Sequence, residues 1–349
     1  MTRLTRYVPA RAAHTVCSIA ALVLVMAFGI NASRPPTIEN PYAHERKKWI
    51  KVNLHVHTKS TGASMTPCDA ATLYASAGYG AIVLADKSSY VTGSAPVTPD
   101  PGPTCDTNPS GTNTVRIIPG YEDTQLDATG GHHLTVANVA VVNVAASNVS
   151  RQSAINYAIQ NPASPDGVFI AFAHPSYVDA GWSNLMMQTV TGVNALEVWN
   201  GQGFDSSANL DAVLTYGTRV WVHAADDPYW PSGIDRAWDV VNANSNSRAD
   251  ILEALRSGRY YAVESPGHAI RCDVRKQDIT CFSYLYEPPE IPFFGTYRWI
   301  GRNGVILRQT DGVSSDTYHV TGSEQYVRLV VSTGTGYDRV GSQPFFISQ

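Results

Sequence analysis

Residues 52–62 read VNLHVHTKSTG, and this segment contains two histidines, His55 and His57, that are separated by one residue. The run before them alternates as a β-strand does, and residues two apart in a strand point to the same face of the sheet. Both imidazoles are therefore expected to face one spot. A single HxH does not by itself identify a metal site, because further metal ligands must come from elsewhere in the chain.

Strand-like and helix-like runs alternate from residue 49 to about residue 264. This alternation predicts a mostly parallel sheet, either open or closed into a barrel. In a parallel barrel, functional side chains gather at the C-terminal ends of the strands. The expected strand ends and starts carry this set: His55, His57, Asp86, Lys87, Glu122, His132, His133, His174, Glu197, His223, Asp226 and Asp227. Imidazoles and carboxylates without thiolates are the ligands that Zn²⁺, Mn²⁺ or Fe²⁺ prefer.

The order of these motifs resembles the polymerase and histidinol phosphatase (PHP) domain. The chain offers, in the family's order, HVHTKSTG, GYGAIVLADK, PGYE, GHHLTV, AHP, LEVWN and DDPY, over about residues 50–263. The resemblance implies an α/β fold, a distorted seven-stranded (β/α) barrel (TIM-like) that carries up to three metals. The later segments YVRLVV and SQPFFI look like the β domain of secreted PHP proteins of the carbaryl-hydrolase-like branch.

Carried over residue by residue, the resemblance implies two metal sites. The first takes His55, His57, Glu122 and Asp227, with Asp226 as the alternative aspartate. The second shares Glu122 and takes His133 and His174, with His132 as the alternative to His133. The ligands of the family's third metal are replaced by Thr61, Lys87 and Tyr229. We therefore expect two divalent ions, Zn, Mn or Fe, and a third site that has been lost.

Two such ions imply hydrolysis of a small-molecule ester, most simply a phosphoester, by a metal-bound hydroxide. Lys87 is a candidate for the positive charge that the third metal would supply. Tyr229 and His223 are candidates for protonating the leaving group, and ordinary packing beside the site is the alternative for both. Two other functions stay open: hydrolysis of a carbamate or another ester, and a non-catalytic exported protein that uses the fold for binding or assembly.

The chain's 349 residues are 44% hydrophobic and 15% charged, with a formal net charge of -4. Nucleic-acid binders usually carry a basic stripe, which this sequence lacks, so we expect no nucleic-acid partner. Three arginines precede an apolar run at residues 16–30, and small residues follow it. This pattern is typical of a secretory signal, and an uncleaved membrane anchor is the alternative. We expect a secreted, periplasmic or cell-surface protein.

The cysteines agree with export. Outside the apolar run there are four, and we expect the pairs Cys272–Cys281 and Cys68–Cys105. A zinc site is the rival interpretation, but the sequence contains no CxxC. After about residue 265 the chain shows only short strands and turns, which predicts a small antiparallel β-sandwich. The predicted domains are residues 1–34 (signal or anchor), 35–264 (PHP domain) and 265–349 (β domain).

Overall fold

Most of the strands that lead to the predicted site residues run in one direction. The protein was analysed as a computed structural model that describes residues 34–44, 46–88, 115–124, 126–127, 130–141, 150–265, 268–285, 291–334 and 338–349. The strands of common direction are β2 (Lys48–Val56), β3 (Ala81–Leu84), β4 (Arg116–Asp123), β8 (Phe169–Phe172), β9 (Ala195–Asn200), β10 (Trp221–Ala225) and β12 (Tyr260–Glu264). Two strands run the opposite way: β7 (Leu134–Ala137) lies between β4 and β8, and β11 (Ala237–Ala243) lies between β2 and β12.

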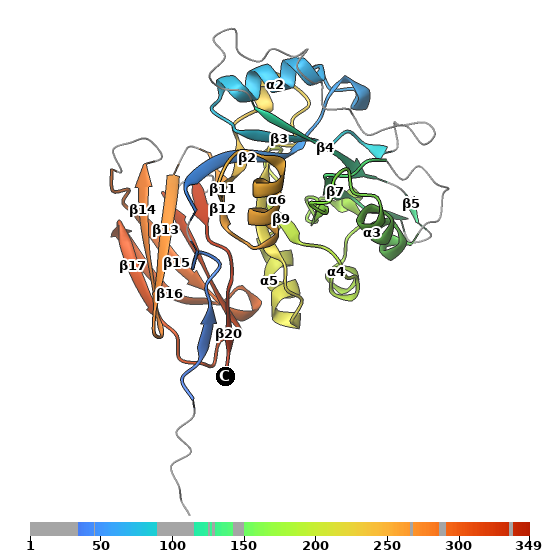
Figure 1. Ribbon diagram of the computed structural model, residues 1–349. Coiled ribbons are helices and arrows are strands. Elements are labelled where there is room, and N and C mark those ends of the chain that lie inside the picture. Colours follow the sequence, from blue (N-terminus) through green and yellow to red (C-terminus); the bar gives the residue numbers. More distant parts are fainter. Residues whose placement is uncertain are drawn as a thin grey trace, which may run out of the picture. The chain divides into compact units, whose positions relative to one another are not determined.

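This arrangement confirms a mixed α/β fold with parallel strands, as the sequence predicts (Figure 1). The predicted closed barrel is not established by the hydrogen bonds. β10, the last strand of the path, forms no described ladder with β2 or β11. It meets them through isolated bonds: the amide of Asp227 donates to the carbonyl of His55 at 3.0 Å, and the amide of Ala224 donates to Asp239 Oδ1 at 3.1 Å.

Helices follow several of these strands. They are α2 (Pro67–Ser76), α3 (Arg151–Gln160), α4 (Asn184–Thr189), α5 (Ser207–Tyr216) and α6 (Arg248–Arg256). Thr66 and Asp69 form a capping box at the start of α2, where they satisfy amides that the helix leaves free. Ser247 caps α6, which ends just before Gly258 at φ 70°. The short 3-10 turns are η1 (Lys59–Thr61), η4 (Val178–Ala180), η5 (Pro231–Gly233) and η6 (Arg302–Gly304).

The C-terminal part consists of antiparallel strands, as predicted. β13 (His268–Arg275), β14 (Asp278–Leu285) and β17 (Ser315–His319) form a three-stranded sheet. The other strands continue the large sheet, because β19 pairs with β12. These two strands lie on either side of the domain boundary that we predict between residues 264 and 265. The strands that continue the sheet are β15 (Gly295–Ile300), β16 (Ile306–Val313), β18 (Tyr326–Ser332), β19 (Arg339–Gly341) and β20 (Phe345–Ser348), and the N-terminal strand β1 (Thr37–Glu39) pairs with β20. A separate two-stranded sheet contains β5 (Leu126–Asp127) and β6 (Gly130–Gly131).

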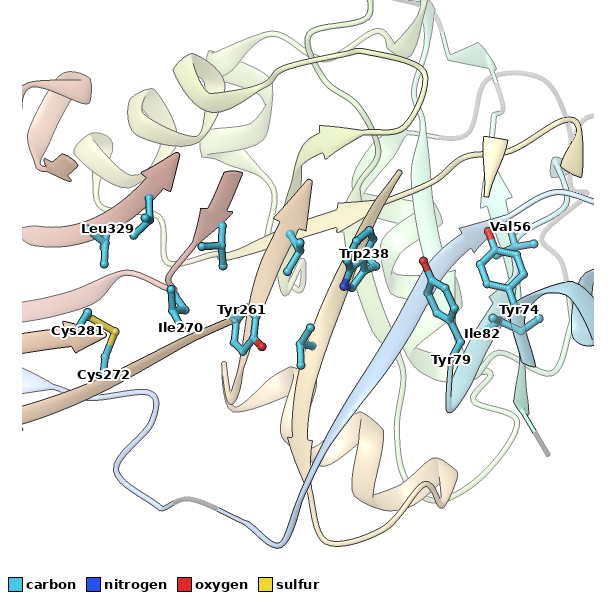
Figure 2. Close-up of a cluster of buried hydrophobic side chains, with 14 of the residues drawn as sticks. Val56, Tyr74, Tyr79, Ile82, Trp238, Tyr261, Ile270, Cys272, Cys281 and Leu329 are labelled. Atoms are coloured by element: carbon cyan, nitrogen blue, oxygen red, sulfur yellow. A yellow bond between two sulfur atoms is a disulfide. The ribbon is translucent and has the colours of Figure 1, made fainter. Parts of the chain in front are cut away.

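One hydrophobic cluster joins the parallel strands to the C-terminal strands. It extends from Tyr74 and Tyr79 through Trp238 and Tyr261 to Ile270 (Figure 2). Burial of such large apolar side chains contributes about 1.5–3 kcal/mol each to folding. All these elements belong to one compact unit, Pro36–Ser348.

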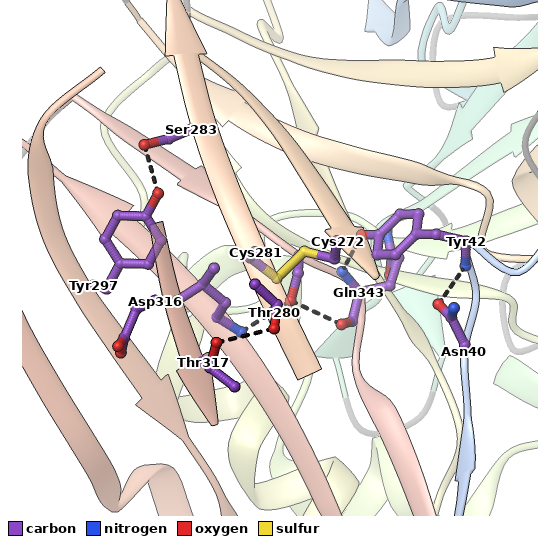
Figure 3. Close-up of a disulfide and its surroundings, with 12 residues drawn as sticks. Asn40, Tyr42, Cys272, Thr280, Cys281, Ser283, Tyr297, Asp316, Thr317 and Gln343 are labelled. Carbon is purple, nitrogen blue, oxygen red and sulfur yellow. Dashed lines mark hydrogen bonds between the residues drawn. A yellow bond between two sulfur atoms is a disulfide. The ribbon is translucent and has the colours of Figure 1, made fainter. Parts of the chain in front are cut away.

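The predicted disulfide Cys272–Cys281 is present. The two cysteines lie opposite each other in the β13–β14 ladder, and both are buried (Figure 3). Cys68 is also disulfide-bonded, whereas its predicted partner, Cys105, lies outside the described residues.

Replacing both Cys272 and Cys281 by Ser is expected to destabilise the protein. The bond closes a short loop, with a sequence separation of 9, so its removal should cost about 2–3 kcal/mol through the entropy of the unfolded chain. Urea unfolding of the wild type and the double variant measures this difference. An unchanged midpoint would contradict a stabilising role for the bond.

The predicted signal or anchor at residues 1–34 lies almost entirely outside the described residues. Among the residues that the structure describes, no helix is both long enough and apolar enough to cross a membrane.

Candidate metal centre

The predicted metal ligands meet at one edge of the sheet. His55 is the penultimate residue of β2 and His57 follows that strand, Glu122 is the penultimate residue of β4, His174 follows β8 and Asp227 follows β10. Because these strands share one direction, their C-terminal ends bring the side chains together. All five residues are buried. The sequence pattern thus predicted which residues gather here.

Glu122 lies at the centre of the cluster. Its Oε1 is 2.7 Å from His133 Nδ1 and 3.1 Å from His174 Nε2. Its Oε2 is 3.4 Å from His57 Nε2 and 3.7 Å from His55 Nε2. The two oxygens of one carboxylate therefore face two different pairs of imidazoles.

Asp227 completes the side of the cluster that contains the HxH pair. Its Oδ1 is 2.9 Å from His57 Nε2 and 3.6 Å from His55 Nε2, and its Oδ2 is 3.8 Å from His174 Nε2. The neighbouring Asp226 has a different environment. Its carboxylate accepts hydrogen bonds from the Tyr74 hydroxyl at 2.8 Å and from the amides of residues 235–237. Asp227 therefore faces the cluster, and Asp226 holds the loop that follows it.

The two neighbouring histidines, His132 and His133, also have different environments. His133 contacts Glu122, whereas the ring of His132 packs 6.1 Å from that of Trp182, with its Nε2 3.7 Å from Asp123. His133 precedes β7 by one residue, and Thr135, two residues later, places its hydroxyl 3.3 Å from His55 Nδ1. Alternation along the strand thus puts His133 and Thr135 on the face of the cluster.

The cluster fits a divalent metal. The possible ligand atoms form two groups, and within each group all atoms lie within 4.8 Å of one another. One group comes from His55, His57 and Asp227, and the other from His55, Glu122 and His174. Several of these buried atoms have no hydrogen-bond partner among the described residues: Nε2 of His55, Nε2 of His57, Oε2 of Glu122 and Oδ1 of Asp227. Such atoms are costly to bury unless something binds them. A cation would satisfy them together.

The backbone at two of these residues is strained. His174 has φ 28° and Asp227 has φ 48°, in the left-handed region that residues with a Cβ rarely adopt. Each such residue costs about 1–3 kcal/mol, and such strain clusters at functional sites. Here the strain belongs to two of the residues that face Glu122 and the HxH pair.

The charges of the cluster are tightly coupled. Burial by itself would lower the pKa of His55, but Asp227 and Glu197 outweigh it and raise this pKa well above its ordinary value. Burial would also raise the pKa of Glu122, yet the neighbouring imidazoles of His133, His174 and His55 hold it well below its usual range. Carboxylates and imidazoles thus stabilise each other's charged forms, as expected where positive charge is favoured at the centre of the site.

Glu197 is a site residue to which the sequence analysis assigned no role. Its Oε2 lies 2.9 Å from His55 Nδ1 and so orients the ring that points its Nε2 into the cluster. Asn200 in turn donates hydrogen bonds to Glu197 and, at 3.2 Å, to Asp227 Oδ2. A carboxylate behind a histidine is the usual way to fix a ligand's tautomer and direction. The one signal in the sequence was the position of Glu197 within a strand that ends at the site.

Of the three residues that we expect in place of a third set of ligands, Lys87 and Tyr229 lie beside the cluster. Lys87 Nζ is 3.9 Å from Glu122 Oε2 and 5.3 Å from the centre of the Tyr229 ring, which itself lies 4.9 Å from the ring of His57. The hydroxyl of Thr61 donates to Asp86, a buried carboxylate that also accepts the amide of Thr58 at 2.6 Å. The structure therefore brings Lys87 and Tyr229, two of the three predicted catalytic residues, to the metal candidates.

The third predicted catalytic residue, His223, is placed differently. It is fully buried, and its Nδ1 lies 2.6 Å from Asp239 Oδ2. Its nearest described ring neighbour is Phe169, at 6.5 Å. No described contact joins His223 to Glu122 or Asp227, so the structure does not bring it into the cluster.

The two aspartates should respond differently to substitution. Asp227→Asn is expected to keep the fold and lose bound metal, because it removes a charged ligand. Asp226→Asn is expected to lower stability by about 1–3 kcal/mol while metal stays bound, because an amide cannot accept all the hydrogen bonds that this carboxylate accepts. Thermal melts and elemental analysis of both variants check this. Metal loss in Asp226→Asn with an intact Asp227→Asn site would reverse the assignment.

Comparison with known proteins gives fold-level likenesses only. No family model and no curated protein matches the chain. Among solved structures, it is similar to a two-domain protein containing a predicted PHP-like metal-dependent phosphoesterase from Bacteroides vulgatus, at 14% identity, a TM-score of 0.48, and coverage of 88% of this chain and 100% of that one. It is also similar to PsfC from Pseudomonas syringae, at 12% identity, a TM-score of 0.44, and coverage of 63% and 93%. Neither likeness assigns an activity to this chain.

Proposed function

We propose that the protein is a metal-dependent hydrolase of the PHP type that cleaves phosphoesters. The observation that carries the proposal is the position of Glu122, whose Oε1 faces His133 and His174 while its Oε2 faces His55 and His57. A carboxylate shared between two sets of imidazoles is the arrangement that holds a pair of divalent ions.

The residues divide into two sets of ligands around Glu122. His55, His57 and Asp227 would hold one ion, and His133 and His174 would hold the other. Divalent ions bound there would lower the pKa of a water molecule and stabilise negative charge that develops on the ester oxygens. Glu197 fixes the direction of His55 through the 2.9 Å contact at Nδ1.

Lys87 and Tyr229 act on the substrate. The ammonium of Lys87 supplies a positive charge at the edge of the cluster, next to Glu122 Oε2. The hydroxyl of Tyr229 is protonated at neutral pH, as in any tyrosine, and can act on a leaving group as a hydrogen-bond or proton donor. His223 has no described contact with the cluster, and we give it no part in the reaction.

A fixed positive charge favours an anionic substrate, and this is why we place phosphoesters before carbamates and carboxyl esters. A phosphomonoester brings oxygens that a lysine ammonium can contact by hydrogen bonds and by charge. An uncharged carbamate would gain much less from Lys87. The resemblance to the carbaryl-hydrolase-like branch stays a prediction.

We also propose that the protein works outside the cytoplasm. The support is the sequence of residues 1–34 together with the Cys272–Cys281 bond, because structural disulfides persist in oxidising compartments. Whether the N-terminal segment is cleaved or anchors the chain can be read from the mass of the mature protein.

Elemental analysis of the purified protein together with a panel of esters tests the proposal. The panel contains phosphomonoesters, phosphodiesters, carboxyl esters and carbamates. We expect bound divalent metal and metal-dependent turnover that is fastest with a phosphoester. Bound metal without turnover of any ester would favour a binding or assembly role instead, and the absence of metal would contradict both.

A further inference from the structure

A cavity of about 280 Å³ lies at the same edge of the sheet as the metal centre. Its lining includes Asn200, Gln202, Arg236, Glu264 and Ser265. Asn200 ends β9 and Ser265 follows β12, and both strands run in the direction of β2, which ends at the HxH pair. The cavity and the metal candidates are therefore placed together by the sheet.

The cavity and the metal centre share a wall. The side-chain amide of Asn200 donates to Asp227 Oδ2 at 3.2 Å, and that of Gln202 donates to the backbone carbonyl of Asp227 at 2.5 Å. The backbone amide of Arg236 donates to Asp226 Oδ1 at 2.8 Å, so Arg236 is also held by the loop that contains Asp227. These hydrogen bonds therefore connect the cavity to the loop that carries the candidate metal ligand Asp227.

Arg236 gives the cavity its charge. Its side chain is exposed, and its described hydrogen bond runs from Nη1 to the carbonyl of Gly201 at 3.3 Å. Among the described residues no carboxylate forms an ion pair with it. The carboxylate in the lining, Glu264, pairs with Arg339 at 2.6 Å, and Arg339 also pairs with Asp205 at 2.6 Å. The guanidinium of Arg236 therefore remains available to an incoming anion.

We propose that this cavity binds a second oxyanion of the substrate, a carboxylate or a phosphate, while the ester lies at the metal centre. Arg236 supplies the charge and a forked pair of donors, which suits oxyanions. The side chains of Gln202 and Ser265, which also line the cavity, supply neutral polar contacts. The substrate class is then a phosphoester whose alcohol portion carries a further acidic group. The inference rests on the proposed function.

Matched substrates test the proposal. Phosphomonoesters of ω-hydroxy carboxylic acids of increasing chain length are compared with the corresponding diol monophosphates, which lack the carboxylate. For the best chain length we expect wild-type protein to prefer the acid by about 10–100-fold in kcat/KM, the contribution of hydrogen bonds to a charged group. Arg236→Gln should remove this preference, Arg236→Lys should restore part of it, and the exposed Arg302→Gln serves as control. No preference at any chain length would overturn the inference but leave the proposed function standing.

Binding gives a readout that does not depend on turnover. The ω-hydroxy carboxylate of the preferred length is titrated by calorimetry into wild-type protein, with and without a chelator. We expect binding that survives the chelator and is lost in Arg236→Gln. Binding that the chelator abolishes and Arg236→Gln preserves would place the carboxylate on the metals and contradict the proposal.

Discussion

Glu122→Gln is expected to remove bound metal and to lower the rate of ester hydrolysis by about 10³-fold or more. Loss of a single charge-stabilising group already costs about 10²–10³ in rate, and Glu122 contacts both sets of imidazoles. The amide is close in size to the carboxylate but carries no charge. The four imidazoles around it should therefore lose their common partner while the surrounding core stays packed.

Elemental analysis, steady-state kinetics and a thermal melt on the same preparation check this expectation. Glu39→Gln, at an exposed glutamate paired with Arg219, is the matched control and should keep metal and rate. If Glu122→Gln retains a full complement of metal, the carboxylate is not shared between two ions and the proposed centre is wrong.

Lys87→Ala is expected to leave metal content intact and to slow hydrolysis of anionic esters by about 10²–10³-fold, the usual effect of removing one charge-stabilising donor. Lys87 Nζ lies 3.9 Å from Glu122 Oε2 but cannot coordinate a metal while protonated. Burial would lower its pKa, but Glu122 and Tyr229 raise it, so the ammonium is retained.

Kinetics with a charged phosphomonoester and a neutral carboxyl ester separate charge stabilisation from a packing role. Only the charged ester should be slowed. Lys48→Ala, at an exposed lysine at the start of β2, is the control. Loss of thermal stability with no selective effect on the charged ester would mean that Lys87 only pairs with Glu122 and supports the fold.

Much of the site could be predicted because the strand ends are visible in the sequence. His55 and His57 alternate in a strand, and Glu122 and His174 end or follow apolar runs, so parallel strands bring them together. The choice of Asp227 over Asp226 could not come from alternation, because Asp227 has φ 48° and the strand geometry has ended there.

Other features depend on tertiary contacts that no local pattern shows. The reversed directions of β7 and β11 follow from pairing with neighbours on both sides and not from their composition. Glu197 and His223 lie opposite each other on paired strands, yet one supports His55 and the other pairs with Asp239. Hydrophobic runs predict that such strands are buried, but not which polar neighbour each side chain meets.

The most direct test of the metal centre is anomalous X-ray diffraction from crystals of the protein grown with Zn²⁺ or Mn²⁺. We predict two ions per chain on either side of Glu122, one near His55, His57 and Asp227 and the other near His133 and His174. No ion is expected among Thr61, Lys87 and Tyr229. An anomalous peak at that third position, or none around Glu122, would contradict the account.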